Sequence, residues 1–395
     1  MARKTFDLTL VVVSVIVSVV LLVALLNRIF HEALRDSWDF LVYWNAARSW
    51  LFGTQSPYFI SSSMNSFVLK YPPWIIPFFA PFALFPEGAA KFLWCLANLI
   101  GIGLAQYWLK LQGISFRLIL VTTLLFWRFW IVHFNAGQLN LLLLGIVIFA
   151  VSSKNRKLRI PLIVLLFTAK IFSAFSLIGI YKKIANKKTL ILATLLFSSS
   201  TLLVLTVMNL HGPTISPLQL FHDWFRASTS GGVELGERIV RSSYNVGFPA
   251  LIMRVLSVKA NQPWADILAA MGVGIILSLT WFHFSKPLKP AEQWLGWISL
   301  GVVVHPLAWH HSFAMIYPLF VIAANKALKS RKALELCWVG VAYLLIDRRY
   351  TLFLGGNRDM ITETLENASV KSWAVVLLAA YLVYQHRTEQ KINRA

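Results

Sequence analysis

The chain of 395 residues is 57% hydrophobic and 14% aromatic, with a mean hydropathy of +0.65, which excludes an ordinary soluble domain. Its formal net charge of +21 would indicate a nucleic-acid partner if the basic residues formed one polar face, but they fall in clusters beside apolar runs. Apolar runs near the roughly 20 residues that span a bilayer recur between residues 8 and 384. We therefore expect an all-α polytopic membrane protein that forms one domain over residues 1–395.

The basic clusters predict the orientation of the chain. Short basic segments between apolar runs mark cytoplasmic loops, and they lie at residues 154–159, 182–188 and 326–332. The first apolar run follows Arg3 and Lys4 and lacks a small-residue cleavage site, so we expect a retained signal anchor. The basic tail at residues 386–395 places the C-terminus in the cytoplasm with the N-terminus.

Residues 31–71 then form the first outer loop. This loop holds Asp36 and Asp39, followed by Tyr43 and Trp44, at the depth where aromatic rings and water meet. Asp39 can stay ionised there and accept a proton, so we expect the chemistry at this residue. The alternative is that both acids only favour the start of a helix, since Asp is common in first turns.

Two elements beside Asp39 have distinctive patterns. Apolar residues recur at helical spacing over residues 38–52, which predicts an amphipathic helix on the membrane interface that ends at Gly53. A proline cluster follows, which predicts a short, kinked or re-entrant element next to a cavity, and it consists of Pro72, Pro73, Pro77 and Pro81.

The middle of the chain leaves the number of crossings open. Runs at residues 89–109, 117–132 and 139–151 fit the orientation only if the proline-rich element does not fully cross or a later run is split. Basic flanks on both sides of residues 160–180 favour a broken hairpin there. Lys170 lies at the centre of that run, where a charge usually faces a cavity or a partner. Its alternative interpretation is snorkelling from a short helix.

Residues 211–245 form the longest polar stretch, which predicts a second large outer loop that binds substrate or acts as a lid. Further runs follow at residues 264–284, 294–309, 311–324, 333–346 and 373–384. Including short and broken segments, we expect roughly 10–13 membrane helices.

Three histidines gather at the outer end of one predicted span. His305, His310 and His311 surround Trp309. The first two are five residues apart, which does not place two metal ligands on one helical face. We favour hydrogen-bonding histidines over a metal site, and expect neither a metal nor a disulfide between the two cysteines.

The sequence lacks a Gly-rich phosphate loop, a Gly-x-Ser-x-Gly elbow and a His-Glu-x-x-His pattern. An enzyme that works outside the cytoplasm without nucleotides needs a donor that is already activated there. A lipid-phosphate sugar meets that need, and Lys170, Arg238 and Arg241 could offer cations to its phosphate.

Several short motifs occur in one order along the chain, and they are Asp39-Phe-Leu-Val-Tyr-Trp-Asn-Ala-Ala, Gly53 with Pro57-Tyr58, Tyr71-Pro-Pro, Gly137-Gln-Leu-Asn140, Lys170 and Trp309-His-His311. In this order the chain resembles glycosyltransferase family 87, polytopic mannosyltransferases that use polyprenyl-phosphate mannose. The resemblance implies a GT-C type fold with Asp39 as the catalytic aspartate of the first outer loop. It also implies a set of substrate-binding residues, namely Tyr43, Tyr71, Gln138, Asn140, Lys170, Arg241, Asn245, His305, Trp309, His310 and His311.

Three functions from different classes follow as hypotheses. The leading one is an inverting hexosyltransferase of the cell membrane, with mannose as the expected sugar, a lipid or glycan as acceptor, Asp39 as base on the outer face and no cofactor or divalent metal. The main alternative is a transporter or flippase for a lipid or anionic solute, which also uses broken helices. The third is a non-catalytic protein of envelope assembly.

Overall fold

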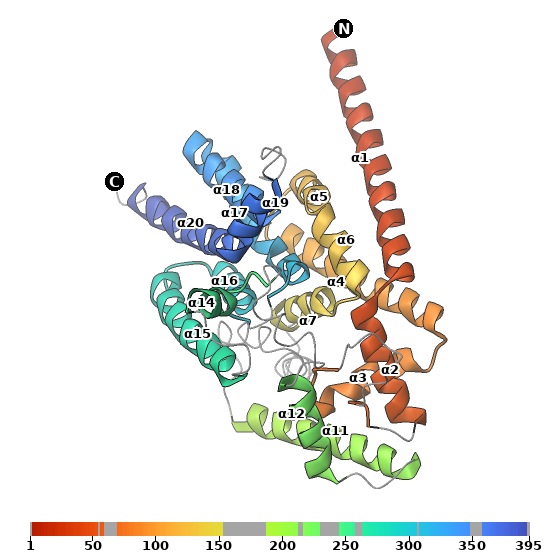
Figure 1. Cartoon of the computed structure of the whole chain (residues 1–395). Helices are drawn as coiled ribbons and strands as arrows, with labels where there is room; N and C mark the ends of the chain where they lie inside the picture. The colour runs from red at the N-terminus through yellow and green to blue at the C-terminus, as the bar shows by residue number, and fades with distance from the viewer. Residues whose placement is uncertain are drawn as a thin grey trace.

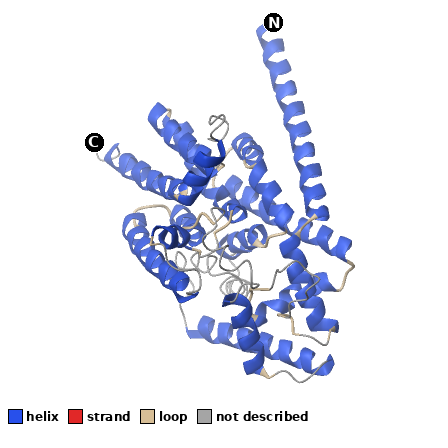
Figure 2. Cartoon of the chain, in the orientation of Figure 1, coloured by secondary structure: helices blue, strands red, loops and turns tan. Residues whose placement is uncertain are grey.

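The computed structural model describes residues 2–53, 56–58, 69–152, 187–211, 216–229, 245–256, 263–305, 308–347 and 358–392. All regular structure in these ranges is helical (Figure 2). The predicted all-α membrane class is confirmed.

The N-terminal half begins with a long helix whose first part projects from the rest of the molecule and whose last turns pack on other helices (Figure 1). Its helices are α1 (Ala2–Arg35), α2 (Trp38–Phe52), the 3-10 turn η1 (Pro73–Ile75), α3 (Ile76–Ala83), α4 (Glu87–Leu111), α5 (Phe116–Leu125), α6 (Trp127–Ala136) and α7 (Asn140–Ser152). The C-terminal half contributes α11 (Lys187–His211), α12 (Pro217–Thr229), α14 (Phe248–Val255), α15 (Pro263–Ser285), α16 (Pro290–Val304), η2 (His310–Ile316), α17 (Tyr317–Ser330), α18 (Ala333–Ile346), α19 (Arg358–Asn367) and α20 (Val370–Ile392).

Within the described ranges, two helices are long and apolar enough to cross a membrane, Val15–Arg35 and Glu87–Leu111. Two bent pairs pass the same test when each is taken as one span. These are α5 with α6, bent by 58°, and Met360–Asn367 with Val370–Lys391, bent by 56°. The number of crossings over the whole chain therefore stays a prediction.

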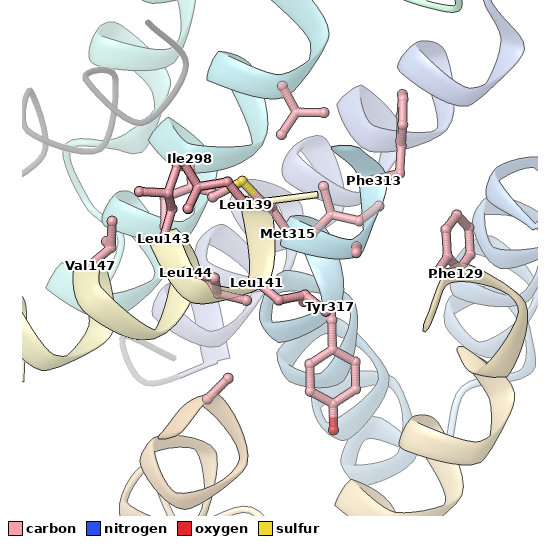
Figure 3. Close-up of a cluster of buried hydrophobic side chains, with 14 of the residues drawn as sticks. Phe129, Leu139, Leu141, Leu143, Leu144, Val147, Ile298, Phe313, Met315 and Tyr317 are labelled. Carbon is pink, nitrogen blue, oxygen red and sulfur yellow. The ribbon is translucent and has the colours of Figure 1, made fainter. Parts of the chain in front are cut away.

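The core centres on α7, which packs closely against α4. A Cβ atom at Gly101 of α4 would clash with the carbonyl oxygen of Leu141, and one at Gly145 of α7 would lie 2.6 Å from the Cα of Gly101. Small residues on both helices thus allow the two backbones to touch. Figure 3 shows the α7 leucines in the buried cluster with Ile298 of α16 and Met315 of η2. This contact fixes the start of α7, where the Gly137–Asn140 motif lies.

The predicted helix at residues 38–52 is confirmed with the same ends, and the Gly53 N–H closes it on the Ser49 carbonyl oxygen. One side of this helix is buried in the protein, and its position on the membrane interface stays a prediction. Phe40, Tyr43 and Trp50 are buried in the protein, because α2 packs on α3 and on α11, where the Trp50 Nε1 donates to the Val204 carbonyl at 3.0 Å.

Of two further expectations, one agrees with the structure and one differs from it. The proline-rich element is short, as predicted, with η1 running directly into α3. The apolar run at residues 294–309 was expected to form one span. The helix there ends at Val304, and the backbone of His305 is extended with ψ 133°. Pro306 explains this end, because a residue before proline avoids the helical region.

Candidate active site

The turn between α1 and α2 is held against the turn between α6 and α7. The Ser37 N–H donates to the Asn135 carbonyl at 2.9 Å, and the Trp94 indole donates to the Gly137 carbonyl at 2.9 Å. Gly137 adopts φ 68°, and a Cβ there would lie 2.8 Å from the Cβ of Phe40. Only glycine combines this left-handed conformation with so close an approach. The two turns are therefore brought together by one glycine.

This approach places Gln138 beside Asp39. The Gln138 Nε2 donates a hydrogen bond to the Asp39 Oδ2, although the two residues are 99 positions apart in the chain. Gln138 is buried, and Asp39 is half-buried in the first turn of α2. A helix N-terminus favours a carboxylate, and the amide fixes one of its oxygens. The arrangement leaves a carboxylate that is oriented by the protein and partly accessible.

Asp36 lies in a different environment from Asp39. Its Oδ2 accepts from Arg35 at 2.7 Å and from the Asn135 Nδ2 at 2.7 Å. The hydrogen bond from the Arg35 guanidinium holds the pKa of Asp36 below its usual value. Asp36 therefore stabilises the end of α1, and this role differs from the one expected for Asp39.

Two tyrosines and one lysine complete the surroundings of Asp39. The hydroxyl groups of Tyr43 and Tyr71 lie 3.4 Å apart, and the Tyr58 hydroxyl donates to the Tyr71 carbonyl at 2.9 Å. Burial raises the pKa of Tyr43 and of Tyr71, so both phenols stay protonated at neutral pH. Burial lowers the pKa of Lys70, and the charge of Asp39 raises it. The Lys70 amine thus lies within electrostatic reach of Asp39.

Helix α12 packs over the segment that carries Lys70 and Tyr71. The Trp224 indole donates to the Lys70 carbonyl at 3.1 Å, and the rings of Trp74 and Trp224 are 5.6 Å apart in a T-shaped pair. The described part of the 211–245 loop therefore covers one side of the Asp39 site. Its action as a lid stays a prediction.

Asn245 supports the backbone of its own segment, and its expected role in binding substrate stays a prediction. Asn245 is fully buried, and its Oδ1 accepts from the Ala308 N–H at 3.1 Å and from the Gly247 N–H at 3.4 Å. Arg254 supports the same segment, because it donates to the Asn245 carbonyl at 3.0 Å and to the Ser369 Oγ at 2.9 Å. Sequence reasoning missed Arg254, which belongs to no motif.

The three histidines of the predicted site have different neighbours. The rings of Trp309 and His311 stack at 6.1 Å, and the His311 carbonyl accepts from the Asn140 Nδ2 at 3.5 Å. His310 turns elsewhere, with its Nε2 3.5 Å from the Oε1 of the buried Glu366. His305 ends α16, and a Cβ at Gly247 would lie 2.8 Å from the His305 carbonyl oxygen.

Of the predicted site residues, the structure brings Asp39, Tyr43, Tyr71 and Gln138 into one cluster. The start of α7 links this cluster to the histidine segment through Asn140. Lys170 and Arg241 lie outside the described residues. In the part of the chain that is described, no three His, Cys, Asp or Glu side chains gather at metal-binding distance. Sequence reasoning missed Lys70, whose only signal is its position directly before Tyr71-Pro-Pro.

Comparison with known proteins gives one match. The sequence model of glycosyltransferase family 87 matches residues 67–306, which include Tyr71, Gln138, Asn140 and His305. No curated protein and no solved structure matches the chain. The matched range begins after Asp39, so the role of Asp39 does not follow from this match.

Proposed function

The chain belongs to glycosyltransferase family 87, and from this premise we propose that it transfers a hexose, with mannose as the first candidate, from a polyprenyl-phosphate sugar to a hydroxyl group of a lipid or glycan acceptor. The family makes the protein a membrane glycosyltransferase. The donor, the sugar, the acceptor and the stereochemistry are the proposal. Membership of a transferase family favours the enzyme hypothesis over the transporter and the assembly-protein hypotheses.

The observation that supports the mechanism is the Asp39–Gln138 hydrogen bond, which lies beside the phenols of the buried Tyr43 and the half-buried Tyr71. In the proposed reaction, the Asp39 carboxylate takes the proton of the acceptor hydroxyl while that oxygen attacks the anomeric carbon. The bond from this carbon to the phosphate oxygen breaks, and its electron pair leaves with the lipid phosphate. The proton ends on Asp39, and the configuration at carbon inverts.

A single base is sufficient for this reaction. Phosphate is a weakly basic leaving group, so it departs with little help from a general acid. The hydrogen bond from Gln138 orients the Asp39 carboxylate, which is half-buried and so stays accessible to the acceptor hydroxyl. Tyr43 and Tyr71 stay neutral and can donate hydrogen bonds to sugar hydroxyls. The proposal requires no cofactor, because the donor carries its own leaving group.

The proposed setting is the outer face of a cell membrane, with several crossings and both termini in the cytoplasm. It is supported by the basic clusters of the sequence and by the apolar helices α1 and α4. Lys170 and Arg241 remain candidates for the donor phosphate on the sequence pattern alone.

The test is incubation of membranes that contain the protein with polyprenyl-phosphate mannose or polyprenyl-phosphate glucose, each labelled in the sugar. We expect label to move into a lipid or glycan fraction from one of these donors, and not in membranes that lack the protein. Transfer from a labelled nucleotide sugar under conditions that block formation of lipid-linked sugar would contradict the proposed donor.

A further inference from the structure

A buried asparagine of α4 faces the turn between α6 and α7. Asn98 is 1% exposed, and α4 is apolar enough to cross a membrane, where a side-chain amide is costly unless it is hydrogen-bonded. Its Nδ2 donates to the Trp94 carbonyl at 3.1 Å. Its Oδ1 accepts from the Leu142 N–H at 3.2 Å and lies 3.0 Å from the His133 Nε2. The two partners of the oxygen lie on opposite sides of the turn that carries Gln138.

The chemistry of these partners fixes the orientation of the amide. A carbonyl can only accept, so the nitrogen of Asn98 faces Trp94, and a backbone N–H can only donate, so the oxygen faces Leu142. An amide oxygen has a second lone pair, and the His133 ring lies against it. The Nε2 of His133 therefore carries a hydrogen and donates to Asn98. Because His133 is fully buried, water does not replace this bond.

The bond from Leu142 takes the place of a helix cap. Helix α7 begins at Asn140, so the Leu142 N–H is one of the first four, which lack a partner within their own helix. The residue before the helix is Leu139, whose side chain has no oxygen to accept from that N–H. Asn98 supplies the missing acceptor. The start of α7 is therefore capped from another helix.

The bond from His133 connects the same amide to the other side of the turn. The His133 carbonyl accepts from the Gln138 N–H at 3.2 Å, so the residue whose ring Asn98 holds also holds the Gln138 backbone. One turn earlier on α4, the Trp94 indole donates to the Gly137 carbonyl. Gln138 thus lies in a short segment that α4 fixes at both ends, and a shift of either end moves its side chain.

We propose that Asn98 is a positioning residue of the active site, which holds the α6–α7 turn where the Gln138 amide orients the Asp39 carboxylate. The inference rests on the proposed function for the role of Asp39 as base. Asn98 acts through Gln138 and takes no part in proton transfer. Small shifts are sufficient to matter, because a displacement of about 1 Å at a catalytic group can cost roughly 100-fold in rate.

The test is a double-mutant cycle on the full chain in nanodiscs, with turnover of a labelled polyprenyl-phosphate sugar as the readout. Asn98→Leu keeps the approximate volume and removes both acceptor positions. We expect its turnover number to fall by about 10-fold or more with a nearly unchanged KM for donor. Because Asn98 acts through Gln138, the variant that combines Asn98→Leu with Gln138→Leu should match Gln138→Leu within about two-fold. Effects that multiply in the cycle would overturn the proposal.

Gln106→Leu is the matched control for loss of an amide from α4. Gln106 is half-buried about two turns further along the helix, and its Nε2 donates to the Thr123 Oγ1 of α5 at 2.9 Å. This variant loses a hydrogen bond between helices away from the turn, so its turnover should equal that of the wild type. An equal loss in Gln106→Leu and Asn98→Leu would overturn the proposal, since any lost amide would then have the same effect.

Two variants of His133 test the other end of the segment. His133→Gln places an amide nitrogen near the position of the Nε2, so it can still donate to Asn98 and should keep most of the turnover. His133→Phe keeps a ring without a donor and should lose turnover as Asn98→Leu does. An equal turnover in these two variants would contradict the role of the hydrogen bond. Folding is checked by the melting temperature in the same nanodiscs, and His133→Phe replaces Asn98→Leu in the cycle if Asn98→Leu does not fold.

Hydrogen exchange separates this inference from the proposed function. In Asn98→Leu the Leu142 amide should exchange roughly 2- to 10-fold faster, the factor that corresponds to a hydrogen bond of ordinary net strength. It should not change in Gln106→Leu. Faster exchange in Asn98→Leu together with a wild-type protein that transfers no sugar contradicts the proposed function alone. Sugar transfer at the wild-type rate by folded Asn98→Leu contradicts this inference alone.

Discussion

Replacing Gly137 by alanine tests whether the close approach of two turns builds the Asp39 site. Gly137 has φ 68°, and the added Cβ would lie 2.8 Å from the Cβ of Phe40 and 3.0 Å from the Cα of Ser37. The left-handed conformation costs alanine about 1–2 kcal/mol. Overpacking against Phe40 and the Ser37 backbone adds about 1–3 kcal/mol. We therefore expect Gly137→Ala to destabilise the protein by roughly 2–5 kcal/mol in all.

Gly113 and Gly103 provide matched controls for the two contributions. Gly113 has φ 77° with nothing within 4 Å of an added Cβ, so Gly113→Ala should show the conformational cost of about 1–2 kcal/mol alone. Gly103 is helical with the same open space, so Gly103→Ala should be neutral or slightly stabilising.

Unfolding followed by tryptophan fluorescence gives the order of stability, and sugar transfer gives the effect on the site. The turnover number of Gly137→Ala should also fall by roughly 100-fold, because a displacement of about 1 Å between Gln138 and Asp39 misplaces the proposed base. If Gly137→Ala and Gly113→Ala proved equal in both stability and turnover, the close approach would not be what forms the site.

Three further expectations follow. Gln138→Leu should lower the turnover number by about 10-fold or more and leave the KM for donor nearly unchanged, because it removes only the group that orients Asp39. An unchanged turnover number in transfer assays would count against that role. Asp36→Asn should keep activity and lose less than about 1 kcal/mol of stability at pH 7. Because the folded pKa of Asp36 is lowered, its contribution is present above its unfolded pKa and is lost as pH falls through the folded value, so wild type and Asp36→Asn should melt alike in acid and differ at neutral pH. In a cysteine-free background, a cysteine at the exposed Arg226 should react with an impermeant reagent from outside and one at the exposed Lys329 should not; the reverse would overturn the proposed orientation.

Local patterns predicted much of the helical structure. The helices at residues 38–52 and 333–346 have the expected ends, because apolar spacing and flanking residues determine them locally. The Asp39–Gln138 contact spans 99 positions and depends on the conformation of Gly137 and on the crossing of α4 and α7, which no local pattern reveals. Only the motif order of the family placed both residues in one site. Lys70 and Arg254 were missed because each acts through distant neighbours.

The central claim is that Asp39 removes the proton of the acceptor. Its most direct test is the turnover of Asp39→Asn with a labelled polyprenyl-phosphate sugar, measured beside the wild type and Asp36→Asn in membranes with matched protein content. Asparagine keeps the volume of the side chain and can still bond to Gln138, but it cannot accept the proton. We predict that turnover falls by roughly 100-fold or more while donor still binds. Wild-type turnover in Asp39→Asn would contradict the account, since another group would then have to activate the acceptor.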